Sequence, residues 1–276
     1  MRRFAQVDVF TARPGRGNPV AVVLDAEGLP DEEMQRLAHW TNLSETTFVL
    51  PPTRPEADYR VRIFTPDREL PFAGHPTIGT CQALWDDGQL GPGPSWVQEC
   101  AAGPVEVRRL DDGALAFAAP APVLVEPLAD EELLARALGG VRPHRPTLIG
   151  IGPVWLTGRV TPAELDALDL DAAAFRELAE VTPDVTLYAV DQAGDLHVRS
   201  FFRVDGGIAE DPVCGSGNAC VARHVQLTAP DARLDGGYRA FQGRHRGRDG
   251  RITVELGERN WIGGRAVTVV SGTIAV

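Results

Sequence analysis

The feature that most constrains this chain is a pattern of residues that occurs once in each half. Residues 61–79 read VRIFTPDRELPFAGHPTIG, and residues 198–217 read VRSFFRVDGGIAEDPVCGSG. The second copy carries a short insertion, and the shared order and spacing predict a duplicated unit, hence two similar lobes. The matching pairs are Arg62 and Arg199, Phe64 and Phe201, Glu69 and Glu210, Pro71 and Pro212, and Gly74 and Gly215.

Each copy is typical of a strand, a glycine-rich turn and the start of a buried helix. In the second copy the turn is EDPVCGSGNAC, residues 210–220, and an apolar segment from Asn218 to Leu227 follows. Free N–H groups at a helix start favour an anion, so each lobe is expected to offer a carboxylate-sized site. We expect the two helix starts to share one cleft, since ligand sites are common between domains.

Composition excludes several classes of function. The 276 residues carry a net charge of -11, which argues against binding nucleic acid or an acidic membrane surface. No lysine is present, so a Schiff base, a pyridoxal-phosphate anchor and a P-loop lysine are ruled out. Neither metal-ligand spacing nor a dinucleotide fingerprint occurs, and a protein without metal or cofactor is expected. The four cysteines are predicted to be reduced thiols.

The pattern of strands and turns places the lobe boundary near residue 118. The first lobe is expected to span residues 1–118 and to be completed by a C-terminal strand at 265–276, and the second to span 119–264. The proline-rich run AAPAPVLVEP, 118–127, is predicted to be the crossover. The arginine-rich segment GRHRGRDGR, 243–251, is predicted to be a solvated hairpin rather than a lid over an anionic substrate.

Two polar residues of the first lobe have competing interpretations. Glu45 is at the entrance of a strand predicted over Ser44–Leu50, and from the sequence a solvated strand end is the favoured interpretation. His75 precedes Pro76, which suits the first position of a helix predicted from about Thr77 to Trp85. A lone histidine is usually structural, but His75 corresponds to Ser216 in the repeat, which favours a functional role.

Four motifs in register make the chain resemble the PhzF family of phenazine-biosynthesis-like isomerases over essentially its whole length. They are GNPVAVV (17–23), NLSETTFV (42–49), ELPFAGHPT (69–77) and EDPVCGSGN (210–218). The resemblance implies the diaminopimelate-epimerase-like α+β fold. In that fold two pseudo-symmetric lobes each wrap a curved, mostly antiparallel sheet around a central helix.

The resemblance also implies roles for particular residues. Glu45 corresponds to the catalytic acid/base of the family, and His75, Asp211 and Ser216 correspond to its other catalytic residues. Substrate-binding positions are Asn18, Cys214 and the two turn glycines, Gly74 and Gly215. The implied reaction is a cofactor-independent proton shift on a small unsaturated cyclic amino or carboxylic acid, in antibiotic or pigment biosynthesis. Dihydro-hydroxyanthranilate-like and pyrroline- or proline-like acids are the substrate candidates.

Cys214 departs from the family pattern, in which threonine is common at this position. In related epimerases both lobes carry a thiol here, but the first lobe of this chain has Ala73. A racemase needs two opposed groups. One alternative is therefore a single-thiol dehydratase or epimerase acting on a hydroxyproline-like acid, and a structural role for Cys214 is equally open. A third alternative is an inactive protein that binds a small carboxylate. The resemblance suggests a homodimer, and the absence of an apolar span or leader predicts a cytoplasmic protein.

Overall fold

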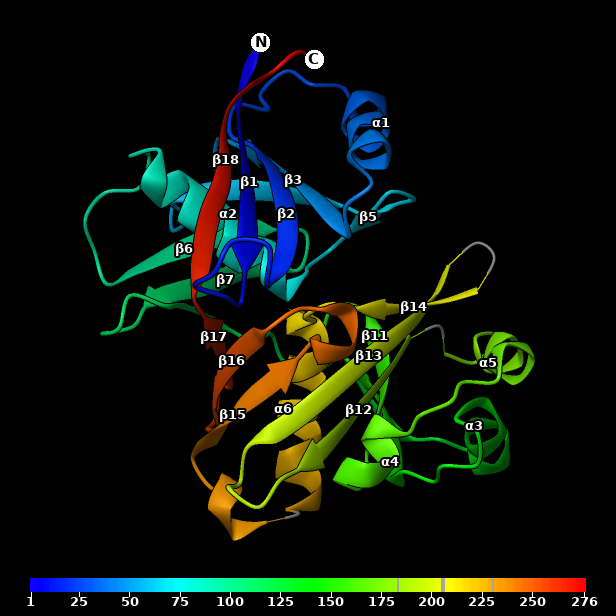
Figure 1. The fold of residues 1–276 in the computed structure, drawn as a ribbon. Helices are drawn as coiled ribbons and strands as arrows, with labels where there is room; N and C mark the ends of the chain where they lie inside the picture. Colours follow the sequence, from blue (N-terminus) through cyan, green and yellow to red (C-terminus); the bar gives the residue numbers. More distant parts are fainter. Residues whose placement is uncertain (183, 205–206, 230) are drawn as a thin grey trace. The chain divides into compact units, whose positions relative to one another are not determined.

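The computed structural model describes residues 1–182, 184–204, 207–229 and 231–276. The chain divides into two compact units: residues 1–120 with 262–276, and residues 121–261. Both mix helices and strands, and each has one long helix that is buried on most of its sides (Figure 1).

In the first unit a curved sheet surrounds helix α2. The strands follow one another in the order β18, β1, β2, β3, β4, β6, β7, β8 and β17. From β18 to β8 the neighbouring pairs are antiparallel, except β2–β3 and β4–β6, which are parallel. Because α2 contacts strands from both ends of this order, the sheet must curl around it. The elements are β1 (Arg2–Val9), β2 (Asn18–Val23), α1 (Asp31–Thr41), β3 (Glu45–Leu50), β4 (Tyr59–Phe64), β5 (Glu69–Leu70), α2 (Gly74–Asp86), β6 (Ser95–Cys100), β7 (Gly103–Arg109), β8 (Leu115–Ala118), β17 (Trp261–Gly264) and β18 (Ala266–Ile274).

The second unit repeats this topology. Its order is β9, β10, β11, β12, β13, β15 and β16, and again the pairs are antiparallel except two, β11–β12 and β13–β15. Helix α6 packs on one face of the sheet, and α3 to α5 form an apolar cluster on the other. The elements are β9 (Leu124–Pro127), α3 (Glu131–Ala137), β10 (His144–Gly150), β11 (Val154–Arg159), α4 (Pro162–Asp166), α5 (Ala172–Leu178), β12 (Asp184–Val190), β13 (Leu196–Val204), β14 (Gly207–Asp211), α6 (Gly215–Thr228), β15 (Gly237–Gln242) and β16 (Gly250–Glu255).

Strand registers and side-chain contacts confirm the duplication read from the sequence. Phe64 pairs with Glu69 across β4 and β5, and Phe201 pairs with Glu210 across β13 and β14. Arg62 and Arg199 each form a bidentate ion pair with the glutamate of their own copy. The guanidinium carbon also lies over the phenylalanine ring of the same copy, 5.0 Å from the ring centroid in the first unit and 4.9 Å in the second. The repeated side chains therefore make repeated contacts.

One strand was not predicted, and one predicted helix start was wrong. The proline-rich run 118–127 contains the boundary between the two units, and it also contains strand β9, which pairs with β10 through Leu124 and Gly150. Its prolines lie at or outside the ends of that strand, where a missing N–H costs little. Helix α2 begins at Gly74 rather than near Thr77. The Ala73 carbonyl accepts hydrogen bonds from the N–H and the hydroxyl of Thr77, so the first turn already includes His75. Pro76 is tolerated there because the first four N–H groups of a helix have no partner within it.

Candidate active site

In the first unit Glu45 and His75 form a buried pair at the start of α2. Glu45 begins β3, and its Oε2 lies 3.3 Å from Nε2 of His75; the two side chains are 15% and 4% exposed. The interpretation of Glu45 as a solvated strand end was therefore wrong. Its burial results from the parallel pairing of Glu45 with Val20 and the approach of the α2 first turn, neither of which is visible in the local sequence.

Burial favours the neutral form of the His75 ring. Burial lowers its pKa to about 3, although a hydrogen bond to the Pro19 carbonyl opposes the shift. Asn18 Nδ2 lies 3.5 Å from His75 Nδ1, and Asn18 is completely buried. A neutral imidazole beside a carboxyl group can share or pass a proton without creating a second buried charge.

The segment before β2 is fixed by a buried carboxylate. Asp8 is 2% exposed, and its oxygens accept hydrogen bonds from the backbone N–H groups of Arg16 at 2.9 Å and Gly17 at 3.1 Å. Gly17 has no room for a side chain, because a Cβ there would lie 2.1 Å from the Val9 carbonyl oxygen. Asp8 and Gly17 thus set the position at which Asn18 enters β2.

In the second unit Cys214 is the N-cap of α6. Its sulfur accepts a hydrogen bond from the N–H of Gly217 at 3.1 Å and lies 3.5 Å from Oγ of Ser216. The cysteine is buried, and all four cysteines are free thiols, as predicted. The corresponding N-cap of α2 is Ala73, whose side chain makes no capping hydrogen bond. A sulfur cap is thus a difference between the two helix starts.

Asp211 ends β14 immediately before this cap and is 9% exposed. Burial raises its pKa to about 6, and hydrogen bonds from Val213 N–H and Cys214 only partly oppose the shift. A carboxyl group with this pKa is present in both protonation states near neutrality, as a proton carrier must be.

Two side chains that hold the second helix start were missed in the sequence. Trp155 donates from Nε1 to Oγ of Ser216 at 3.1 Å. Gln242 accepts from the N–H of Cys214 at 3.1 Å and from Nδ2 of Asn218 at 3.0 Å, and it donates to the carbonyl of Asp211 at 3.1 Å. Gln242 therefore fixes the turn on which Asp211 and Ser216 lie.

The first unit also uses a glutamine at its helix start, but from a different position in the strand. Gln98 of β6 donates to Oγ1 of Thr77 at 2.9 Å, whereas the strand register matches Gln98 with Ala240 and Gln242 with Cys100. Thr77 and Asn218 are both the fourth residue of their helix, and both bond to the carbonyl of the N-cap residue. The contact between a strand glutamine and the fourth helix residue is therefore shared, although the glutamines are not at equivalent positions.

The register also reveals a second strand-start carboxylate. Thr47 pairs with Ile63 in the first unit, and Thr186 pairs with Ser200 in the second, so the residue equivalent to Glu45 is Asp184. Like Glu45, Asp184 begins its strand and takes part in a parallel pair, with Trp155 as its partner.

The described parts of the chain contain no group of three His, Cys, Asp or Glu side chains placed to hold a metal ion. Among the helices of the same residues, none is long and apolar enough to cross a bilayer.

Comparison with known proteins identifies the family of the chain. The family model for phenazine biosynthesis-like proteins, PhzC-PhzF, matches residues 7–272. The chain belongs to this family. An uncharacterized isomerase of Mesorhizobium japonicum is 37% identical over 308 aligned residues, which cover 100% of this chain and 99% of the relative. The trans-2,3-dihydro-3-hydroxyanthranilate isomerase of Pseudomonas aeruginosa is 55% identical over 84 residues, 30% of each protein.

Solved structures support the same assignment. A Bacillus anthracis phenazine biosynthesis protein of the PhzF family has a TM-score of 0.83 and 27% identity, over 100% of this chain and 99% of its own. A probable proline racemase from Agrobacterium radiobacter has a TM-score of 0.69 and 16% identity, over 100% and 93%, and shares the fold alone. The recognition of the PhzF family, the diaminopimelate-epimerase-like fold class and the assignment as an isomerase are therefore confirmed. The roles of the site residues, the cytoplasmic location and the homodimer stay predictions.

Proposed function

We propose that this PhzF-family isomerase moves an allylic proton along a small unsaturated cyclic amino or carboxylic acid, with Glu45 as the acid/base. The observation that carries the proposal is the burial of the Glu45 carboxyl group against the neutral ring of His75 at 3.3 Å. A partly desolvated carboxyl group beside an uncharged partner is suited to take and return one proton. No cofactor is required for such a transfer.

We propose that the helix start beside Glu45, with the first-turn amides of Gly74 and His75, binds the substrate's carboxylate, and that the helix start of the second unit, with the amides of Gly215 and Ser216, is an anion-binding position in its own right. All four residues are buried at helix starts. Helix N-termini stabilise negative charge through their free N–H groups and the helix dipole. The amides beside Glu45 would also stabilise the dienolate that forms when the proton leaves, which is the larger catalytic benefit.

In the proposed reaction Glu45 removes a proton from a carbon adjacent to the double bond. The C–H electron pair enters the conjugated system, the double bond moves by one position, and the protonated Glu45 returns the proton to the far carbon on the same face. His75 holds the carboxyl group and the substrate's amino or hydroxyl group in place. Asp211, whose pKa is about 6, can carry a second proton between heteroatoms.

The named relatives support a cyclic amino acid as substrate. The P. aeruginosa relative acts, by its name, on trans-2,3-dihydro-3-hydroxyanthranilate, and its identity to this chain is confined to 84 residues. We therefore propose an unsaturated ring acid of this kind, and keep pyrroline- or proline-like acids as the alternative, in an antibiotic or pigment pathway.

The test is exchange of carbon-bound hydrogen in D₂O, followed by NMR on a panel of unsaturated cyclic amino acids. We expect the wild-type protein to incorporate deuterium and to shift the double bond. Glu45→Gln should lose about 10²- to 10⁴-fold in rate while still binding substrate. Glu69→Gln is a matched control and should keep its activity, because Glu69 forms a partly exposed ion pair with Arg62 and has no proposed role in the reaction. Near-full activity of Glu45→Gln would refute the role of Glu45, and binding without exchange would indicate an inactive carboxylate-binding protein.

Cys214 supports a second candidate, a single-thiol dehydratase or epimerase of a hydroxyproline-like acid. The supporting observation is that its sulfur accepts from Gly217 N–H at a helix start, where a thiolate is favoured. Cys214→Ser separates the two candidates. Loss of activity in this variant, with Glu45→Gln active, would favour the thiol reaction, whereas the reverse result supports the proton shift.

A further inference from the structure

The hairpin between β15 and β16 is longer and more basic than its counterpart in the first unit. In the first unit β6 and β7 pair up to Cys100 and Gly103, so only residues 101–102 connect them. In the second unit pairing ends at Gln242 and Gly250, and the loop 243–249, Gly-Arg-His-Arg-Gly-Arg-Asp, connects them. An arginine-rich insertion into one copy of a duplicated scaffold indicates a function specific to that copy.

This loop closes a cavity of about 60 Å³ beside Arg199. The cavity is on the face of the sheet opposite α6: Ser200 lies beside Gly217 of α6, and successive side chains of β13 alternate between faces. The outer end of α4, at Leu165 and Asp166, forms another wall. A volume of this size holds on the order of four water molecules, which is room for one tetrahedral oxyanion.

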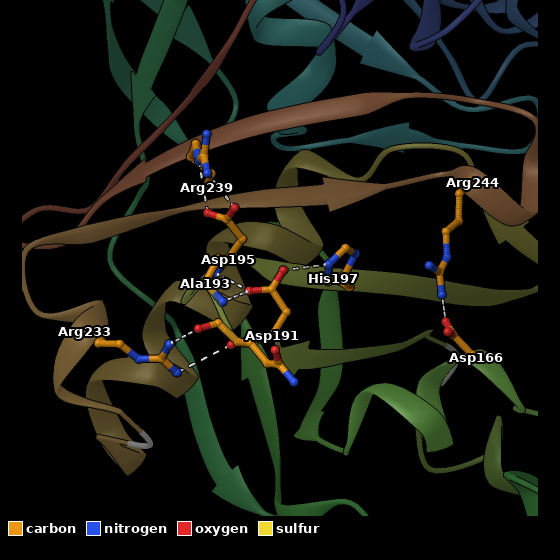
Figure 2. Close-up of polar contacts among 9 residues, drawn as sticks. Asp166, Asp191, Ala193, Asp195, His197, Arg233, Arg239 and Arg244 are labelled. Atoms are coloured by element: carbon orange, nitrogen blue, oxygen red, sulfur yellow. Dashed lines mark hydrogen bonds and ion pairs between the residues drawn. The ribbon is translucent and has the colours of Figure 1, made fainter.

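Three arginines, Arg199, Arg244 and Arg248, line the cavity together with two acidic residues, Asp166 and Asp249. This is a local excess of positive charge in a chain whose net charge is -11. Arg244 forms an ion pair with Asp166 of α4 (Figure 2). The loop is thereby joined to the far wall, so the cations are positioned before any ligand arrives.

Arg199 is the most fixed of the three. Its side chain is 12% exposed, its Nε and Nη2 form a fork with Glu210, and its Nη1 donates to the Leu165 carbonyl at 3.0 Å. The equivalent Arg62 makes the same fork with Glu69, but its Nη1 contacts a second carboxylate, Asp31. In the first unit Arg62 thus contacts two carboxylates. In the second unit the Leu165 carbonyl takes the place of one of these carboxylates, and Arg244 and Arg248 lie nearby.

Aromatic and imidazole rings complete the wall. His197 stacks on Phe241 with ring centroids 5.7 Å apart, and its Nε2 lies 3.2 Å from Oδ2 of Asp191 (Figure 2). Asp191 is itself fixed by the backbone N–H groups of Ala193 and Asp195. The wall is therefore held in place by bonds that do not involve the cavity.

We propose that this cavity binds a compact oxyanion, of which inorganic phosphate is the simplest member. Arginine forks recognise the tetrahedral oxygens of phosphate or sulfate in preference to a point charge such as chloride. The site would also influence the helix start that carries Asp211. A Cβ on Gly243, the first residue of the loop, would lie 2.3 Å from the Pro212 carbonyl oxygen, and the preceding Gln242 holds the turn by three hydrogen bonds.

The direct test is isothermal titration with inorganic phosphate at an ionic strength held constant with sodium chloride. We expect one site per chain with a Kd of about 1 mM. Arg244→Gln should weaken binding about tenfold or more, because it removes a donor and leaves the Asp166 carboxylate facing the ligand. Arg246→Gln is the matched control: Arg246 is in the same loop and is not part of the cavity lining, so this variant should bind within about twofold of wild type.

A second readout follows the ring of His245. Burial lowers the pKa of His245, and the charges of Arg199 and Arg244 add to the shift, while Glu210 opposes it. The Asp166 carboxylate faces the ring at 3.7 Å. An anion in the cavity should raise this pKa, which NMR titration of the His245 ring proton measures with and without phosphate. Arg246→Gln should show the same rise, and Arg244→Gln should not.

Titrations with sulfate and with glycerol phosphate distinguish a free oxyanion from the terminal phosphate of an ester. Binding of sulfate and phosphate alone assigns a free oxyanion, and tighter binding of the ester assigns a phosphomonoester. The proposal is overturned if phosphate gives no heat and no shift of His245, or if Arg246→Gln loses binding as much as Arg244→Gln, which would indicate general charge screening. These measurements use no substrate of the isomerase, so their failure leaves the proposed reaction untouched.

Discussion

Replacing Asp211 by asparagine should stabilise the protein near neutral pH while it abolishes activity. The pKa of Asp211 is raised from 3.8 to about 6 by burial. Between these two values the folded state holds a proton that the unfolded state has lost, so stability falls as pH rises from about 4 to about 6. Above pH 6 the full penalty of burying the charge is present, about 3 kcal/mol for a shift of about two units.

Asparagine removes this penalty and keeps the local hydrogen bond. Its side-chain oxygen can still accept from Val213 N–H, which bonds to Asp211 Oδ1 at 3.0 Å. At pH 8 the variant should therefore melt at a higher temperature than wild type, by on the order of 5 °C. At pH 4 the difference should largely disappear, because Asp211 is then mostly protonated in the folded state. Scanning calorimetry over this pH range measures the effect.

Asp191 is the matched control with the opposite sign. Burial favours its neutral form, but hydrogen bonds from Asp195, Ala193 and His197 outweigh this and lower its pKa (Figure 2). The ionised form of Asp191 therefore stabilises the fold, so Asp191→Asn should lower the melting temperature at pH 8. If Asp211→Asn lowers the melting temperature at pH 8 by as much as Asp191→Asn or more, burial does not destabilise the ionised form of Asp211. Its proposed role as a proton carrier would then lose its physical basis.

Two further predictions concern the helix starts. The pKa of His75 is lowered to about 3, so between pH 6.5 and 3 the unfolded state binds a proton that the folded state does not bind. The free energy of unfolding should therefore decrease by up to about 5 kcal/mol as the pH falls through this range. His75→Gln should show a smaller decrease in acid-unfolding curves. A decline of equal depth in that variant would refute the assignment. Gln242→Leu removes three buried hydrogen bonds and should lower the free energy of unfolding in urea by about 4 kcal/mol, even though Asn218 keeps its bond to the Cys214 carbonyl. Gln98→Leu, which removes one such bond, should lower it by about 1–2 kcal/mol. Equal losses would contradict the role of Gln242 as the organiser of the turn.

The sequence predicted the parts of this fold that are encoded by local pattern. The strand and glycine turn before Gly215 are readable because apolar alternation and small residues occur within one short segment. The short strand β9 was missed because its prolines were taken as breakers, although they lie at its ends. The burial of Glu45, and the roles of Trp155 and Gln242, depend on strands that are distant in the sequence, so only the paired sheet reveals them.

The duplication favours the proposed proton shift over a racemisation. What the two copies share is support: the arginine–glutamate fork, a glutamine on the strand after the helix that bonds to the fourth helix residue, and a polar fourth helix residue that bonds to the N-cap carbonyl. What they do not share is chemistry, because Glu45 and His75 are replaced in the second copy by Asp184 and Ser216. A racemase needs two groups of matched strength on opposite faces, whereas one base can both remove and return a proton on the same face. Symmetric support with different polar groups in the two copies therefore favours the proposed same-face isomerisation.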